Sequence, residues 1–302
     1  MAAREVASPR HRWGGAARVP VPPGYPLALT FLVRRVPRMS RPVRLAISGA
    51  SGRMGLALLD LARDDERFEL VRAVVSPSSG RLGKAVYGDV SPIRFADWSG
   101  DGDVDVVIDF SGPDGLLAAI ERCEASGAAL VTGTTGLSPA IEERLAKAGE
   151  SIAVLRAANF SLGVAVLTRL LREAAAALPG WDLDIVEAHH NRKEDAPSGT
   201  ALALGHAAAA GRGATLDELA VYAREGRTGP RQAGTIGFAV VRGGDIVGEH
   251  QALLMGQGER IELGHRATDR SIFARGALEA AAWITGRAPG AWTIEDVIAA
   301  KV

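Results

Sequence analysis

Two adjacent imidazoles and an ammonium group fall within five residues of one another, at His189, His190 and Lys193. Side chains of these types exchange protons and supply positive charge, which is typical of an acid–base site for an anionic substrate. The structural alternatives are strand-end histidines held by hydrogen bonds beside a solvated lysine, or half of a zinc site. Neighbouring strand residues point to opposite faces, and no convincing third ligand accompanies the pair, so we predict no metal site.

A helix start follows this cluster directly. Ser198 precedes an apolar run of helix formers over 201–210 and is predicted to be the N-cap. The free N–H groups of Gly199 and Thr200 would then face an anion, supported by the positive end of the helix dipole. Together with the basic cluster, this start predicts a site for a small substrate with several carboxylates.

A glycine-rich turn in the first half of the chain predicts a nucleotide site. Gly49, Gly52 and Gly55 follow an apolar strand predicted over 43–48 and open a helix predicted over 54–63. In the dinucleotide-binding fingerprint, such glycines allow a tight turn, a close approach to the pyrophosphate, and close packing of helix on strand. A bare glycine turn is the alternative, but a second strand also follows where the fingerprint requires it.

The end of that second strand, 68–75, carries no acidic residue. Sites selective for NAD usually place Asp or Glu there to bind the ribose hydroxyls. Ser76 occupies the position instead, and the hydroxyl and cationic side chains after it are Ser78, Ser79, Arg81 and Lys84. These groups would accept a 2′-phosphate, so we predict that NADPH is used at least as well as NADH. The alternative is an ordinary mobile loop, and Arg53 would either add charge near the phosphates or lie in solvent.

The elements that position these residues form two patterns. Up to residue 156, strands and helices alternate, with further strands predicted over 105–110, 128–132 and 152–156 and helices over 115–126 and 139–149. This alternating series, which ends with the strand over 152–156, predicts an α/β fold with a doubly wound parallel sheet. After Asn159 the pattern changes. A helix is predicted over 163–177 and a strand over 182–189. Adjacent strands over 235–242, 245–252 and 259–267 are predicted to form an open mixed or antiparallel sheet. The chain is predicted to end in helices over 272–285 and 294–300.

Composition narrows the classes of protein. The 302 residues are enough for two domains, and 47% hydrophobic with 23% charged residues is typical of a globular chain. A formal net charge of zero gives no reason to expect nucleic acid as a partner. Cys123 is the single cysteine and is predicted to be a buried hydrophobe. No apolar run approaches the ~20 residues that span a membrane, so we expect a cytoplasmic protein.

The first 38 residues differ in kind. They hold seven arginines, no lysine and one acidic residue, Glu5, together with several prolines. Three interpretations stay open for residues 1–38: upstream sequence ahead of a true start at Met39, an organelle transit peptide, or a disordered arm.

From about Arg44 to the C-terminus, the sequence resembles the dihydrodipicolinate (4-hydroxy-tetrahydrodipicolinate) reductase family. The resemblance is carried by short blocks in the family's order, at 49–55, 108–111, 133–136, 157–161, 187–190 with Lys193, 195–200, 234–238 and 243–250. It implies a Rossmann-type dinucleotide-binding domain over 39–160 and 271–302. An α+β domain inserted over 161–270 would bind substrate and assemble a homotetramer.

The resemblance also implies an activity. The reaction would be the NADPH- or NADH-dependent reduction of 4-hydroxy-tetrahydrodipicolinate, with loss of water, in diaminopimelate and lysine biosynthesis. Hydride from the nicotinamide would add to the ring, and the resulting enamine would collect a proton. Two other functions remain as alternatives: a nicotinamide-binding sensor without turnover, and a related reductase or dehydrogenase acting on another small amino or keto acid.

Individual roles are implied position by position. His189 matches the family's proton donor and acceptor, and Lys193 matches its second proton-donating residue. The expected substrate contacts are His190, Ser198, Gly199 and Thr200. The expected cofactor contacts are Gly49, Ala50, Ser51, Gly52, Arg53, Met54, Ser76, Gly133, Thr134, Thr135, Ala157, Ala158, Asn159 and Phe160.

Overall fold

The computed structural model describes residues 41–88, 91–100 and 102–301. The predicted arm over residues 1–38 lies outside these described residues. None of the helices in the described ranges combines the length and hydrophobicity that a bilayer crossing requires.

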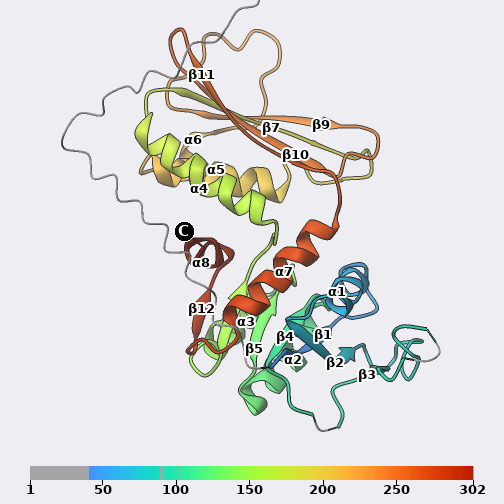
Figure 1. Cartoon of the computed structure of the whole chain (residues 1–302). Coiled ribbons are helices and arrows are strands. Elements are labelled where there is room, and N and C mark those ends of the chain that lie inside the picture. The colour runs from blue at the N-terminus through green and yellow to red at the C-terminus, as the bar shows by residue number, and fades with distance from the viewer. Residues whose placement is uncertain (1–40, 89–90, 101, 302) are drawn as a thin grey trace, which may run out of the picture. The chain divides into compact units, whose positions relative to one another are not determined.

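The first sheet has seven strands, all parallel, in the order β12-β6-β5-β4-β1-β2-β3 (Figure 1). Its strands are short and mostly buried, as expected when helices cover both faces of a parallel sheet. They are β1 (Val43–Ser48), β2 (Phe68–Val74), β3 (Phe95–Ala96), β4 (Val106–Asp109), β5 (Ala129–Thr132), β6 (Ala153–Arg156) and β12 (Gly290–Trp292).

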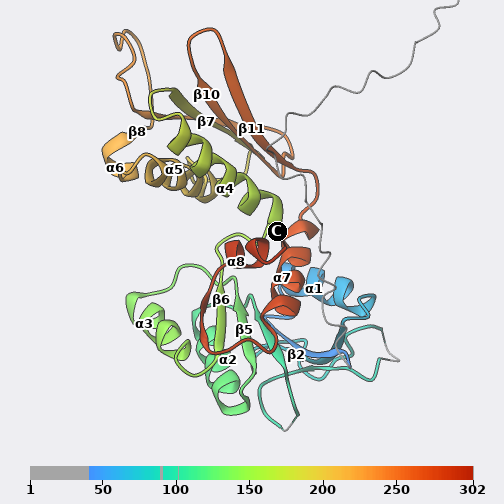
Figure 2. The same ribbon diagram turned by 60° about the vertical axis from the view of Figure 1, so that its left-hand side comes forward.

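Helices pack on both faces of this sheet, which confirms the doubly wound, Rossmann-type fold (Figures 1 and 2). One face packs against α1 (Arg53–Arg63), α7 (Ser271–Ile284) and α8 (Ile294–Ala299). The other face packs against α2 (Pro113–Ser126) and α3 (Pro139–Ala148). Cys123 lies in α2 as a buried residue, as predicted, and its burial raises the pKa of the thiol well above the usual range.

The second sheet has five strands in the order β11-β10-β7-β9-β8. The central strand β7 (Asp182–His189) is parallel to β9 (Ile236–Arg242) and antiparallel to β10 (Gly248–Met255). The remaining strands are β8 (Ala220–Val221) and β11 (Arg260–Ala267). The sheet is therefore mixed, as expected.

Helices cover one face of the second sheet. Alternate residues of β7 are buried, which is the period-2 pattern of a sheet with one covered face. Leucines and alanines of α4 (Leu162–Ala177) and α5 (Gly199–Gly211) pack onto that face in a common core. The short α6 (Leu216–Leu219) packs against α5, and Figures 1 and 2 show all three helices on the same side.

Two predictions about the later strands were wrong, their adjacency and the start of β10. β9, β10 and β11 are not three neighbouring strands, because β7 lies between β9 and β10, and β10 begins at Gly248 rather than at residue 245. The edge strand β12, which pairs with β6 in the first sheet, was not predicted. The sequence also gave no sign of β3, β8 and α6, each of four residues or fewer.

Candidate active site

The predicted cofactor residues lie at the carboxyl edge of the first sheet. Parallel strands end at the same edge, so the loops after β1, β2, β5 and β6 all emerge there. The strand order reverses between β1 and β4, and open α/β sheets bind ligands at such a switch point. This edge brings together the predicted residues at 49–54, 76, 133–135 and 157–160.

The turn after β1 has the backbone that a phosphate-binding loop needs. Gly49 has a φ of 76°, and a Cβ there would lie 2.6 Å from the carbonyl oxygen of Phe110. Gly55 is equally constrained, because a Cβ would collide with the carbonyl oxygen of Gly49. Gly52 caps α1 without a side-chain hydrogen bond, which leaves the first N–H groups of the helix for an anion. These residues fit a dinucleotide pyrophosphate.

A buried carboxylate holds two of the edge loops. Asp109, at the end of β4, is completely buried. Its Oδ2 accepts hydrogen bonds from the hydroxyls of Thr132 (3.1 Å) and Thr134 (2.7 Å), and its Oδ1 accepts from Ser111 Oγ (2.5 Å). The loops after β4 and β5 are therefore tied together beneath the predicted cofactor residues.

The predicted 2′-phosphate region follows β2. Ser76 is exposed, and its Oγ lies 2.9 Å from Ser78 Oγ, so two hydroxyls sit side by side. Arg81 stacks over the ring of Phe95, with 5.6 Å from its guanidinium carbon to the ring centroid. No acidic side chain stands at the end of β2.

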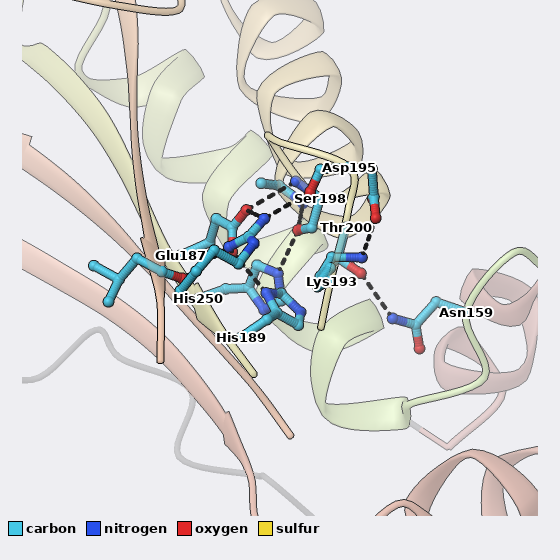
Figure 3. Close-up of polar contacts among 11 residues, drawn as sticks. Asn159, Glu187, His189, Lys193, Asp195, Ser198, Thr200 and His250 are labelled. Carbon is cyan, nitrogen blue, oxygen red and sulfur yellow. Dashed lines mark hydrogen bonds and ion pairs between the residues drawn. The ribbon is translucent and has the colours of Figure 1, made fainter. Parts of the chain in front are cut away.

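The loop after β6 joins the cofactor edge to the start of α5. The Oδ1 of Asn159 accepts from the peptide N–H of Ser161 (2.8 Å), which orients the amide. Its Nδ2 donates to Thr200 Oγ1 at 3.0 Å (Figure 3). A predicted cofactor residue therefore contacts a predicted substrate residue directly, while Phe160 is buried against Phe110 with 5.5 Å between the ring centroids.

His189, Lys193 and Thr200 gather at the start of α5 (Figure 3). β7 ends on the buried His189, and the turn that follows carries Lys193, whose Nζ donates to Asp195 Oδ1 at 2.8 Å. Ser198 is the N-cap of α5, as predicted, since its Oγ accepts from the peptide N–H of Ala201 at 3.1 Å. Gly199 is exposed beside it.

His190 is set apart from His189 by the alternation of the strand. Its peptide N–H donates to the carbonyl of Ile246 (2.8 Å), and its ring is half-buried. Partial burial and the nearby charge of Arg270 lower the pKa of its imidazole, which favours the neutral ring.

Three side chains that support His189 were not predicted. Glu187 is buried, and its Oε2 lies 2.6 Å from His189 Nδ1. Arg242, on β9, donates to both carboxylate oxygens of Glu187, at 2.7 and 2.8 Å. His250, on β10, packs edge-on against His189 and contacts Ser198 Oγ at 3.0 Å (Figure 3). Glu187 could have been found from its position two residues before His189 on one strand face, but the other two come from neighbouring strands.

Comparison with known proteins covers both halves of the described chain. The family "Dihydrodipicolinate reductase, N-terminus" matches residues 43–160, and "Dihydrodipicolinate reductase, C-terminus" matches residues 163–298. The 4-hydroxy-tetrahydrodipicolinate reductase of Thiobacillus denitrificans is 46% identical over 265 residues, which cover 86% of this chain and 99% of that protein. The protein of the same name from Caulobacter vibrioides is 44% identical over 266 residues, which cover 87% of this chain and 100% of its relative.

A solved structure has the same fold. Dipicolinate-bound dihydrodipicolinate reductase from Paenisporosarcina sp. TG-14 aligns with a TM-score of 0.65 at 22% sequence identity, covering 84% of this chain and 99% of that one. The two family matches and the high identity to full-length relatives confirm the resemblance found in the sequence. The chain belongs to the dihydrodipicolinate reductase family.

Proposed function

We propose that this protein catalyses the NADPH- or NADH-dependent reduction of 4-hydroxy-tetrahydrodipicolinate to tetrahydrodipicolinate, with loss of water, in diaminopimelate and lysine biosynthesis. Relatives that carry this activity in their names match the chain over nearly their whole length. The observation that carries the proposal is the contact of Asn159 with Thr200, which joins the nucleotide-type edge to the start of α5. An acid–base pair, His189 and Lys193, lies at that same helix start.

Each side chain has a distinct task in this reaction. The N–H groups of Gly199 and Thr200 bind one substrate carboxylate at the helix start, and Lys193 and His190 hold the other end. A reduced nicotinamide bound at the edge of the first sheet supplies the hydride. His189 or Lys193 then gives a proton to the electron-rich ring carbon. Asn159 fixes the distance between the two binding regions through its hydrogen bond to Thr200.

NADPH is the cofactor that the loop after β2 favours. Ser76 and Ser78 present hydroxyls, and the segment 75–84 contains no acidic residue whose carboxylate would repel a 2′-phosphate. We expect a kcat/KM for NADPH at least equal to that for NADH. The substitution Ser76→Asp supplies the missing acid and should lower the value for NADPH while sparing NADH. A wild-type preference strongly in favour of NADH would contradict this assignment.

Residues 39–160 and 271–302 form the cofactor domain of this proposal, and residues 161–270 form the substrate and assembly domain. This division is supported by α7 and β12, because they follow the second sheet in sequence but pack with the first sheet. The uncovered face of the second sheet, defined by Val186, Val241 and Leu253, offers a surface for a homotetramer. Val241 is 49% exposed on this open face. A cytoplasmic location stays a prediction.

A coupled assay tests the activity. The preceding synthase, supplied with pyruvate and aspartate semialdehyde, generates the substrate in place, and loss of NADPH or NADH absorbance is followed when this protein is added. Rapid oxidation that requires the synthase is expected. A sensor would bind cofactor without turnover, and a reductase for another small acid would leave this substrate untouched, so no oxidation with either cofactor overturns the proposal.

A further inference from the structure

A buried carboxylate lies directly behind His189. Glu187 precedes it by two residues on β7, so both side chains point to the same face of the sheet. The Glu187 side chain is 1% exposed, and its Oε2 lies 2.6 Å from His189 Nδ1. Burial alone would raise its pKa, but hydrogen bonds from Arg242, His189 and the peptide N–H of Ser198 lower it on balance. Glu187 is therefore a charged acceptor inside the protein.

This contact determines where the proton on the imidazole resides. A carboxylate can only accept, so the ring nitrogen that faces it must donate, which places the proton on Nδ1. The other nitrogen, Nε2, lies beside Gly248, where a Cβ would be 3.0 Å from it. Because position 248 has no side chain, there is space beside Nε2 on that side.

We propose that Glu187 is a positioning residue that holds His189 with its proton on Nδ1 and turns Nε2 toward the reacting ring, and that Arg242 holds Glu187 in place. The proposal rests on the function proposed above. Glu187 itself would not contact the substrate.

Arg242 extends this arrangement to the rest of the site. Its Nη1 and Nη2 each donate to one oxygen of Glu187, and Nη2 also donates to the carbonyl of Asp195 at 2.7 Å. Asp195 belongs to the turn that carries Lys193, while the Glu187 Oε1 accepts from the N–H of Ser198 at 2.9 Å. A single charged pair thus fixes the imidazole, the lysine turn and the first residue before α5.

His250 completes the surroundings without competing for Glu187. Its ring centroid lies 5.1 Å from that of His189, and its Nε2 contacts Ser198 Oγ. Burial, aided by the charge of neighbouring His189, lowers the pKa of His250 to about 4, so this ring is neutral at physiological pH. Among these side chains, Arg242 and His189 contact the Glu187 carboxylate, and His250 contacts Ser198 instead.

The first test reads the proton position in the protein without substrate. Nitrogen-15 NMR of labelled wild-type protein at pH 8 should show His189 protonated on Nδ1. In Glu187→Gln the new amide can donate to Nδ1, which should increase the share of the tautomer protonated on Nε2. Glu249→Gln is the matched control, because Glu249 pairs with Arg266 at 3.0 Å and lies opposite Ala188, on the other face of the sheet from Glu187 and His189.

The second test is a double-mutant cycle on turnover. Glu187→Gln alone should lower kcat by about 10²-fold or more, with a much smaller change in KM, as expected when a histidine adopts the wrong tautomer. In a His189→Ala background the same substitution should cost nothing further. A purely structural role for Glu187 would lower turnover in both backgrounds.

Several results would overturn the inference. They are a wild-type His189 protonated on Nε2, an unchanged tautomer and kcat in Glu187→Gln, or equal losses in the wild-type and His189→Ala backgrounds. If Glu187→Gln does not fold, two measurements still test the inference. One is the tautomer of His189 in the wild type, and the other is the variant Arg242→Lys, which should also increase the share protonated on Nε2. An inactive wild-type enzyme with the Nδ1 tautomer would refute the proposed function while confirming that Glu187 holds the proton of His189 on Nδ1.

Discussion

His189 and Lys193 carry the proton chemistry proposed for this site, and neither belongs to a hydrophobic core cluster of the described residues. Replacing either with alanine should therefore lower kcat by roughly 10²-fold or more while the protein stays folded, since each removes a general acid or a positive charge. Steady-state kinetics with circular dichroism would check this. Arg192→Ala, a neighbouring exposed cation, is the control expected to keep its rate. Near-normal turnover in both variants would move the acid chemistry elsewhere.

His250 should make stability depend on pH. Its folded pKa of about 4 lies below the usual 6.5, so the unfolded chain takes up a proton more readily between these values. Stability from this group is fully present above pH 6.5 and is lost as the pH falls toward 4, to a total of about 3 kcal/mol. Urea unfolding at pH 7 and pH 5 should show a smaller difference in His250→Gln than in the wild type.

The exposed His206 gives the comparison for that experiment. His206→Gln should keep the wild-type difference between the two pH values. An identical pH dependence in His250→Gln and the wild type would show that the buried ring is not the cause.

Some residues of this site could be predicted from the local sequence, and others could not. The types and spacing of His189, Lys193 and Ser198 predicted a helix start beside an acid–base cluster, and the structure brings them together. Local sequence contains that information. Arg242 and His250 reach the same place through strand pairing, which depends on contacts far apart in the chain, so no spacing rule revealed them.

The loops after β4 and β5 should depend on Asp109. An amide accepts through only one of its two atoms, so Asp109→Asn leaves at least one of the hydroxyls of Ser111, Thr132 and Thr134 without its acceptor. We expect a loss of about 1–3 kcal/mol in the free energy of unfolding, together with weaker NADPH binding as the loop of Thr134 shifts.

Urea unfolding and a fluorescence titration with NADPH would measure both effects. Asp114→Asn, an exposed acid in the first turn of α2, should change stability by only a few tenths of a kcal/mol. Unchanged stability and unchanged NADPH affinity in Asp109→Asn would mean that the buried carboxylate does not hold the loops.

Long elements were predictable and short ones were not. The strands from β1 to β6 that span four residues or more, and the helices between them, carry their own periodic patterns. β12 has three residues after a helix and joins the first sheet only because β6 offers an open edge. The insertion of β7 between β9 and β10 is likewise fixed by the core that α4 and α5 build on one face, not by local pattern.

The two sheets position different kinds of groups for the proposed reaction. The first provides backbone N–H groups at glycine turns, and the second provides charged side chains at strand ends. The hydrogen bond from Asn159 to Thr200 joins them within one chain. The second sheet additionally leaves its open face uncovered by the described helices, so assembly and substrate binding would use opposite faces of the same strands.

The open face should therefore decide the oligomeric state. Val241→Glu places a charge opposite Ala188 on the open face, and burying it in an interface without a partner would be costly. Size-exclusion chromatography with light scattering should show a tetramer for the wild type and smaller species for this variant. Val166→Glu, on the exposed side of α4, is the matched control and should remain a tetramer. A monomeric wild type, or a tetrameric Val241→Glu, would contradict assembly through this face.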